Sequence, residues 1–169
     1  MSYDLSYILS KQQYHHSEAL GALADATAVK VLIKCPAAGA AFFGAILDVD
    51  VSAFGGTLGG ASLVEICEAP TTSSDGTART PRNANRLDTP LTTTIGVFLN
   101  TDATGGTVLQ AGQVSLGESF KSDCFILKPA VNYLVRVTNQ SGDVLINGTI
   151  NVKLKQIPTA DQMYRKKAY

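Results

Sequence analysis

The chain of 169 residues contains no tryptophan, only two histidines and two methionines, and no excess of either sign of charge. Its 14 basic and 14 acidic side chains are spread along the sequence, so the chain lacks the basic patch that marks nucleic-acid-binding proteins. No apolar run approaches the roughly 18 residues that a membrane-spanning helix needs. The first residues also lack a basic segment followed by an apolar one. We therefore expect no direct contact with nucleic acid, no membrane span and no export signal.

Cysteine is scarce, and its three positions, Cys35, Cys67 and Cys124, lie far apart. An odd number of cysteines in a chain without an export signal is typical of reduced thiols rather than of a disulfide framework. Each cysteine lies in or beside an apolar run, where a free thiol behaves as a small hydrophobic side chain. We expect all three to be reduced and packed.

Motifs that carry catalysis are missing as well. There is no glycine-rich phosphate loop, no nucleophile elbow and no cysteine pair at zinc spacing. His15 and His16 are adjacent, so surface exposure or local packing is the expected role, with a metal site as the alternative. Asp48 and Asp50 share a strand face and could bind a hard cation if a third oxygen ligand converged, although a solvated face is the simpler interpretation. We predict that the chain is no enzyme and binds no cofactor and no metal.

Alternation of apolar and polar residues is the dominant pattern that is present. Val64 and Ile66, for example, alternate with Glu65, as in a strand with one buried face. Such patterns predict strands over 29–35, 42–53, 63–67, 92–99, 124–127, 133–138 and 144–154, with short strands around Val108 and Val114. Short strands without a long amphipathic helix predict an all-β fold. The expected architecture is an antiparallel β-sandwich, with the jelly roll as its topology.

Glycines mark several of the connections between these strands. Residues 71–76 read as a turn in which Gly76 takes a positive φ. Residues 139–143 are expected to join the last two strands as a tight hairpin, with Gly142 at the position that most needs a positive φ. Gly148 interrupts the last strand and suggests a bulge or a close backbone approach.

The two ends differ from the middle of the chain. Residues 1–23 are assigned to an N-terminal arm, in which the alanine-rich stretch 17–28 begins and could be a short helix or an extended segment. Residues 24–157 form the predicted sandwich domain. Residues 158–169 follow a proline and are polar, basic and aromatic, so we assign them to a C-terminal tail that a neighbouring molecule could order.

Two groups of residues are candidates for contacts with other subunits or with a capsid. Arg79, Arg82 and Arg86, with Asn83 and Asn85 between them, could bind a partner through their guanidinium groups. The alternative is a loop whose Arg and Asn side chains satisfy its own backbone. The second group lies in the tail and consists of Tyr164, Arg165, Lys166, Lys167 and Tyr169.

Three segments carry a resemblance to a protein family. In order, ADATAVKVLIKCP, VEICEAPTTSSDGTARTPRNANR and FILKPAVNYLVRVTNQSGD resemble small structural proteins of tailed bacteriophages, a group that includes decoration or cement proteins and proteins of unassigned place in the virion. The resemblance covers about residues 24–152, and the longer ending from Lys153 to Tyr169 departs from it. It rests on Glu68, Gly76, Asn83, Asn85, Arg86, Pro129, Tyr133, Arg136, Asn139 and Gly142.

The resemblance implies a β-sandwich without a catalytic residue. On this basis the expected function is that of a capsid decoration protein that stabilises the head, located in a virion assembled in the host cytoplasm. Its expected partners are the major capsid protein and copies of itself, so we expect a homo-oligomer.

Two other functions are alternatives. The same fold could serve in the tail, as a fibre, a baseplate component or a host-binding module. Loops rich in aromatic residues and a sugar-sized pocket would favour this alternative. A polysaccharide-degrading enzyme would need paired acids in a cleft, and Glu65, Glu68 and Glu118 are the residues to consider.

Overall fold

The computed structural model describes residues 13–38, 44–54, 61–84, 93–115, 117–142 and 147–157. Over these ranges the chain forms strands only, and none of its segments is a helix that could cross a membrane. The strands are β1 (Gln13–Ala19), β2 (Ala28–Lys34), β3 (Gly44–Phe54), β4 (Ala61–Glu68), β5 (Thr77–Arg79), β6 (Arg82–Asn83), β7 (Gly96–Leu99), β8 (Thr107–Ser115), β9 (Ser119–Lys121), β10 (Phe125–Leu127), β11 (Asn132–Asn139) and β12 (Asn147–Ile157).

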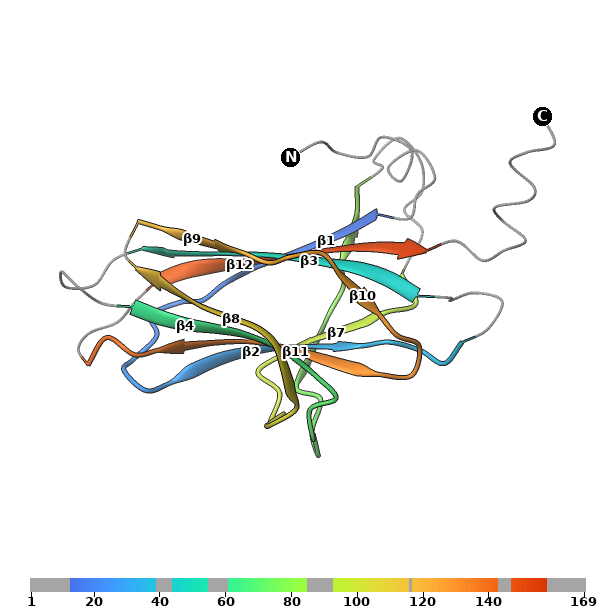
Figure 1. Cartoon of the computed structure of the whole chain (residues 1–169), viewed down its shortest axis with the longest axis horizontal. Coiled ribbons are helices and arrows are strands. Elements are labelled where there is room, and N and C mark those ends of the chain that lie inside the picture. The colour runs from blue at the N-terminus through green and yellow to red at the C-terminus, as the bar shows by residue number, and fades with distance from the viewer. Residues whose placement is uncertain are drawn as a thin grey trace.

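The strands form two antiparallel sheets that pack face to face (Figure 1). The upper sheet of Figure 1 has the order β10-β3-β12-β1-β6, and β9 also pairs with β3. The lower sheet has the order β5-β7-β2-β11-β4-β8. The predicted all-β antiparallel sandwich is therefore confirmed.

The pairing is nested in the way that a rolled-up hairpin requires. β1 pairs with β12, β2 with β11, β3 with β10 and β9, and β4 with β8, so strands near the start of the chain meet strands near its end. Successive pairs alternate between the two sheets, which is the arrangement of a jelly roll. β5, β6 and β7 are an insertion between β4 and β8, and they extend both sheets on the side opposite β8.

The core lies between the sheets because each long strand turns every second side chain inward. Val49 and Val51 of β3, Ile150 and Val152 of β12 and Tyr133 of β11 are fully buried there. Each such aliphatic side chain contributes about 1.5–3 kcal/mol through its removal from water. The parities expected for the segments around residues 64, 135 and 152 are confirmed.

A second, smaller cluster lies on the outer face of the lower sheet. Leu32, Cys67, Ala103 and Leu134 are fully buried, and Phe98 packs against them. The connection between β7 and β8, which contains Ala103, contributes to this cluster and explains why Leu134 is buried on a face that its strand otherwise presents to solvent.

The cysteines are all free, and two of them are packed as expected. Cys35 and Cys67 are buried, and burial raises the pKa of the Cys35 thiol to about 12. The neutral thiol is therefore the only form present near pH 7. Cys124 is exposed, so the expectation that it is packed is wrong.

Part of the predicted N-terminal arm belongs to the sandwich. Residues 13–19 form β1, which lies inside the upper sheet between β12 and β6. The short helix considered for residues 17–28 is absent, because this stretch contains the end of β1, a turn and the start of β2. Residues 1–12 and the predicted tail, 158–169, lie outside the described residues.

The predicted hairpin between the last two strands is wrong. β11 pairs with β2 and β4 in the lower sheet, whereas β12 pairs with β1 and β3 in the upper sheet, so the connection crosses between sheets. Gly142 has the expected positive φ of 70°. Gly148 pairs in regular register with Ala53, and the register shift lies instead between Ile66 and Cys67 of β4, where β8 has one extra residue, Leu109.

Candidate functional site

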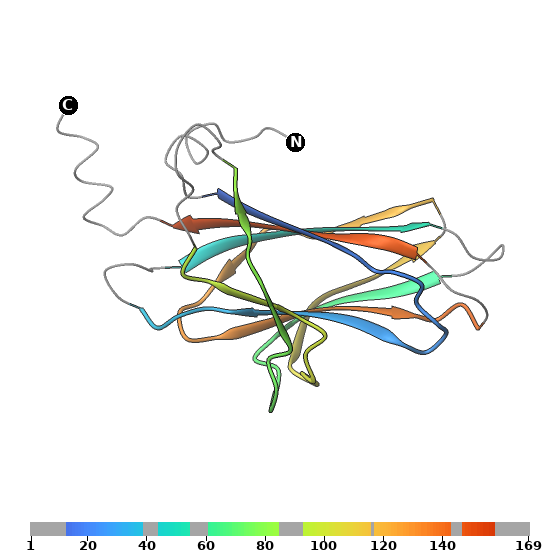
Figure 2. The ribbon, with the colours of Figure 1, turned by 180° about the vertical axis from the view of Figure 1, so that it is seen from behind.

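The chain crosses from the lower to the upper sheet between β5 and β6. Arg79 ends β5 at the edge of the lower sheet, and Arg82 starts β6, which pairs with β1 of the upper sheet. Pro81 is buried at the crossing, a position that suits a residue unable to donate a backbone hydrogen bond to a ladder. Figure 2 shows this yellow-green crossing in front of the sandwich. We call the region around it the crossover site.

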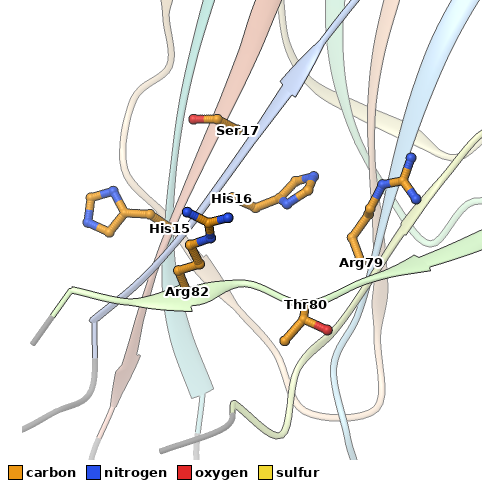
Figure 3. Close-up of a pocket in the computed structure, with 6 residues that line it drawn as sticks. All are labelled: His15, His16, Ser17, Arg79, Thr80 and Arg82. Atoms are coloured by element: carbon orange, nitrogen blue, oxygen red, sulfur yellow. The ribbon is translucent and has the colours of Figure 1, made fainter. Parts of the chain in front are cut away.

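A pocket of about 410 Å³ opens at the crossover site. Its lining residues are His15, His16, Ser17, Arg79, Thr80 and Arg82 (Figure 3). They come from two places in the sequence that are more than 60 residues apart, and the pairing of His15 with Arg82 brings these together. Because successive side chains of a strand point to opposite faces, His15 and His16 diverge in Figure 3 and do not converge on one metal ion.

Glu18 of β1 forms an ion pair with Arg79 of β5 and so links the two sheets beside the pocket. Arg79 Nε donates a hydrogen bond of 3.0 Å to Glu18 Oε2, and the two side chains are one third and one fifth exposed. His16 Nε2 lies 3.3 Å from the same oxygen but is not aligned for a hydrogen bond. Arg82 is exposed, so its guanidinium is accessible to solvent.

Both histidines are held in the neutral form. Burial lowers the pKa of His15, and Lys153 lowers it further, while Asp48 acts in the opposite direction. Burial also lowers the pKa of His16, against the effect of Glu18. At pH 7 the two guanidinium groups and the one carboxylate therefore leave the crossover site with a net charge of +1, which suits an anionic group.

The predicted contact residues divide into two sets. Arg79 and Arg82 lie together at the crossover site, and Arg79 bonds to a side chain of another strand rather than to its own loop. Arg86 lies outside the described residues, as do Tyr164, Arg165, Lys166, Lys167 and Tyr169.

Three residues of the site escaped the sequence prediction. His15, His16 and Glu18 were assigned to an arm because QYHHSEA contains no alternating aliphatic residues. The one available signal was Tyr14, which is buried and shares its face with His16 and Glu18.

Of the two acidic residues considered as cation ligands, Asp48 has a basic neighbour. Asp48 lies 3.8 Å from Lys153 Nζ, and both side chains are largely buried. Asp48 and Asp50 do share the outer face of β3, but β3 is an inner strand of its sheet. Within the described ranges no group of three or more His, Cys, Asp or Glu side chains could hold a metal ion.

A second polar cluster holds the connection between β4 and β5. Asp102 accepts hydrogen bonds from the backbone N–H groups of Ser73 and Ser74, at 3.0 and 2.9 Å, and from the hydroxyls of Thr72 and Ser73. These bonds, the Ser73 hydroxyl first, hold the pKa of Asp102 well below its usual range. The cluster therefore fixes the connection between β4 and β5.

No protein-family model matches the chain, and no curated protein matches its sequence.

Proposed function

We propose that the chain is a non-enzymatic structural protein of a tailed-phage virion, and specifically a decoration protein that binds and stabilises the assembled capsid. The observation that carries the proposal is that most edge strands of the two sheets are short. Four of the five described edge strands, β5, β6, β9 and β10, have only two or three residues each, and β8, with nine residues, is the exception. Short edges prevent unspecific strand pairing at the high local concentration of a protein shell.

The residues that carry the family resemblance support this proposal because they hold the fold. Gly76 has a φ of 87° and packs against the backbone at Leu99. The Tyr133 hydroxyl accepts a hydrogen bond from the Lys128 N–H, and Asn139 Nδ2 donates to the Leu23 carbonyl. A resemblance at such positions points to a shared scaffold rather than to a shared reaction.

Basic side chains lie at the end of the upper sheet where β1 begins and β12 ends. Gln13 of β1 pairs with Lys155 of β12 there. Arg82 pairs with His15 at the same end of the upper sheet. A contact with an acidic surface of the major capsid protein would use this end of the sheet.

Copy number tests the proposal. We expect quantitative mass spectrometry of purified particles, with the major capsid protein as internal standard, to find this chain in numbers comparable to that protein. A handful of copies per particle would move the chain to the tail. Its absence from particles would overturn the virion role.

The pocket favours a second candidate, a tail-associated module that binds the host. A volume of about 410 Å³ falls in the range of small-ligand sites, and its guanidinium groups suit the carboxylate of an acidic sugar. Binding of an acidic oligosaccharide that is lost in the Arg82→Ala variant would support this function. A head-only location would exclude it.

A further inference from the structure

One edge strand differs from all the other described edges. β8 has nine residues, and its sequence TVLQAGQVS contains no charge and no proline. The shorter edges β5, β6 and β9 each carry a basic residue: Arg79, Arg82 and Lys121, respectively. Charges, prolines and short lengths are the devices by which proteins prevent pairing between sheet edges. β8 has an irregular pairing with β4 near its start, at Leu109. Along Gln110–Ser115 it has none of these devices.

Some backbone N–H and C=O groups of β8 face away from β4, its only ladder partner among the described strands. Ser115 lies opposite Ala61 of β4, yet its N–H donates to Glu118 Oε2 and its carbonyl accepts from the Glu118 N–H. Its polar groups therefore face away from β4. Because this direction alternates along an antiparallel strand, the N–H and C=O groups of Ala111 and Gln113 also face away from β4.

Glu118 and Asp123 bond to the two ends of this stretch, at the Ser115 backbone and the Gln110 side chain, and no described segment covers the edge between them. Figure 1 shows β8 at the front of the lower sheet, with β9 in the other layer above it. Phe120 of β9 packs on the inner face of β8, where a Cβ atom on Gly112 would meet its ring at 2.8 Å. The side chains of Ala111 and Gln113 are exposed on the outer face.

We propose that β8 is the interface with a second copy of this chain, formed by antiparallel β8–β8 pairing about a two-fold axis at Gly112. This register sets Ala111 opposite Gln113 of the second copy, and Gln113 opposite its Ala111. Every outward N–H and C=O group of these two residues then has a partner. A register centred on Gln113 would set Ala111 opposite Ser115, which is already bound to Glu118. A register centred on Ala111 would set Gln113 opposite Leu109, where the regular pairing of β8 is interrupted.

The strand suits a copy of itself better than any charged partner. Two-fold pairing sets neutral side chains against neutral ones, so no like charges meet across the axis. The lower sheets of the two copies would join into one continuous sheet. This inference names a surface for the self-association within the proposed function, but it is argued from β8 alone, so either proposal can fail without the other.

Sedimentation of the full-length chain tests the interface. We expect a monomer–dimer equilibrium within concentrations up to about 1 mM, since a single strand pair is a small contact. The A111K/Q113K variant sets lysine against lysine across the axis and should weaken the dimer at least about tenfold. The A111K/Q113E variant sets lysine against glutamate and should dimerise like the wild type.

The matched pair keeps the test independent of folding, because both variants change the same two exposed positions. A wild type that stays monomeric over this range would overturn the proposal, as would equal dimerisation of both variants. Hydrogen exchange tests the register: the amides of Ala111 and Gln113 should exchange more slowly in the dimer. Unchanged exchange at both amides would also overturn it.

Discussion

At the scale of single residues, Gly76 shows how one backbone position fixes a loop. Its φ of 87° lies in the left-handed region, and a Cβ atom would sit 2.3 Å from the Leu99 carbonyl oxygen and 2.8 Å from the Thr101 nitrogen. The loop that carries Arg79 therefore lies against β7 only if this residue has no side chain.

The Gly76→Ala variant should lose more than about 2 kcal/mol of unfolding free energy, because left-handed strain adds to a backbone clash. Gly142→Ala is the matched control, with a φ of 70° but open space around its Cβ position, and should lose only about 1 kcal/mol. Urea denaturation measures both. Equal losses would mean that the contact with Leu99 relaxes at little cost.

The two histidines make stability depend on pH near neutrality. Burial lowers the pKa of both below the usual value near 6.5, so the unfolded chain binds more protons than the folded one. Their contribution is therefore complete above about pH 6.5 and falls as the pH drops through their folded pKa values.

His15 and His16 are the only histidines of the chain, so the H15Q/H16Q variant removes this effect entirely. We expect the urea midpoint of the wild type to fall between pH 7.5 and 5.5, and that of the variant to fall less. Parallel pH profiles would show that other groups cause the decrease.

At the scale of elements, the Glu18–Arg79 pair joins β1 of one sheet to β5 of the other. A double-mutant cycle with Glu18→Gln and Arg79→Met should give a coupling of about 0.5–1 kcal/mol, since the pair is only partly shielded from water. The Lys128–Glu68 pair is the control, because its lysine is 64% exposed and should show no measurable coupling. Coupling in the control pair but not in the Glu18–Arg79 pair would show that this pair does not link the two sheets energetically.

Local pattern reveals some elements and not others. β2, β4 and β11 alternate apolar and polar residues over most of their length, so sequence alone predicts them. β1 was missed because its buried face consists of Tyr14, His16 and Glu18 rather than aliphatic residues. The hairpin between β11 and β12 was mispredicted because alternation shows that a strand has a buried face but not which strand lies beside it.

The candidate site shows the same limit. Sequence alone indicates Arg79 and Arg82 as contact residues because of their guanidinium groups. His15 and Glu18 lie beside them only because β1 pairs with β6. No local pattern indicates a contact between residues so distant in the sequence.

At the scale of the whole molecule, the last described strand, β12, ends at Ile157. Deletion of residues 159–169 should therefore leave the melting temperature of the isolated protein nearly unchanged. If the tail contacts neighbouring subunits, binding to particles should fall, as a co-sedimentation assay would show. Equal losses of melting temperature and binding would mean that the tail is part of the fold.

The position of β12 also governs when the protein can fold during its synthesis. β12 lies between β3 and β1, so the upper sheet stays divided until Asn147–Ile157 has left the ribosome. Among the described strands, β1 and β12 join the residues that lie farthest apart in the sequence, and such contacts slow folding to the millisecond-to-second range. The sandwich is therefore completed only after β12 has been synthesised, and chains that terminate before β12 expose the unpaired edges of β1 and β3 to aggregation.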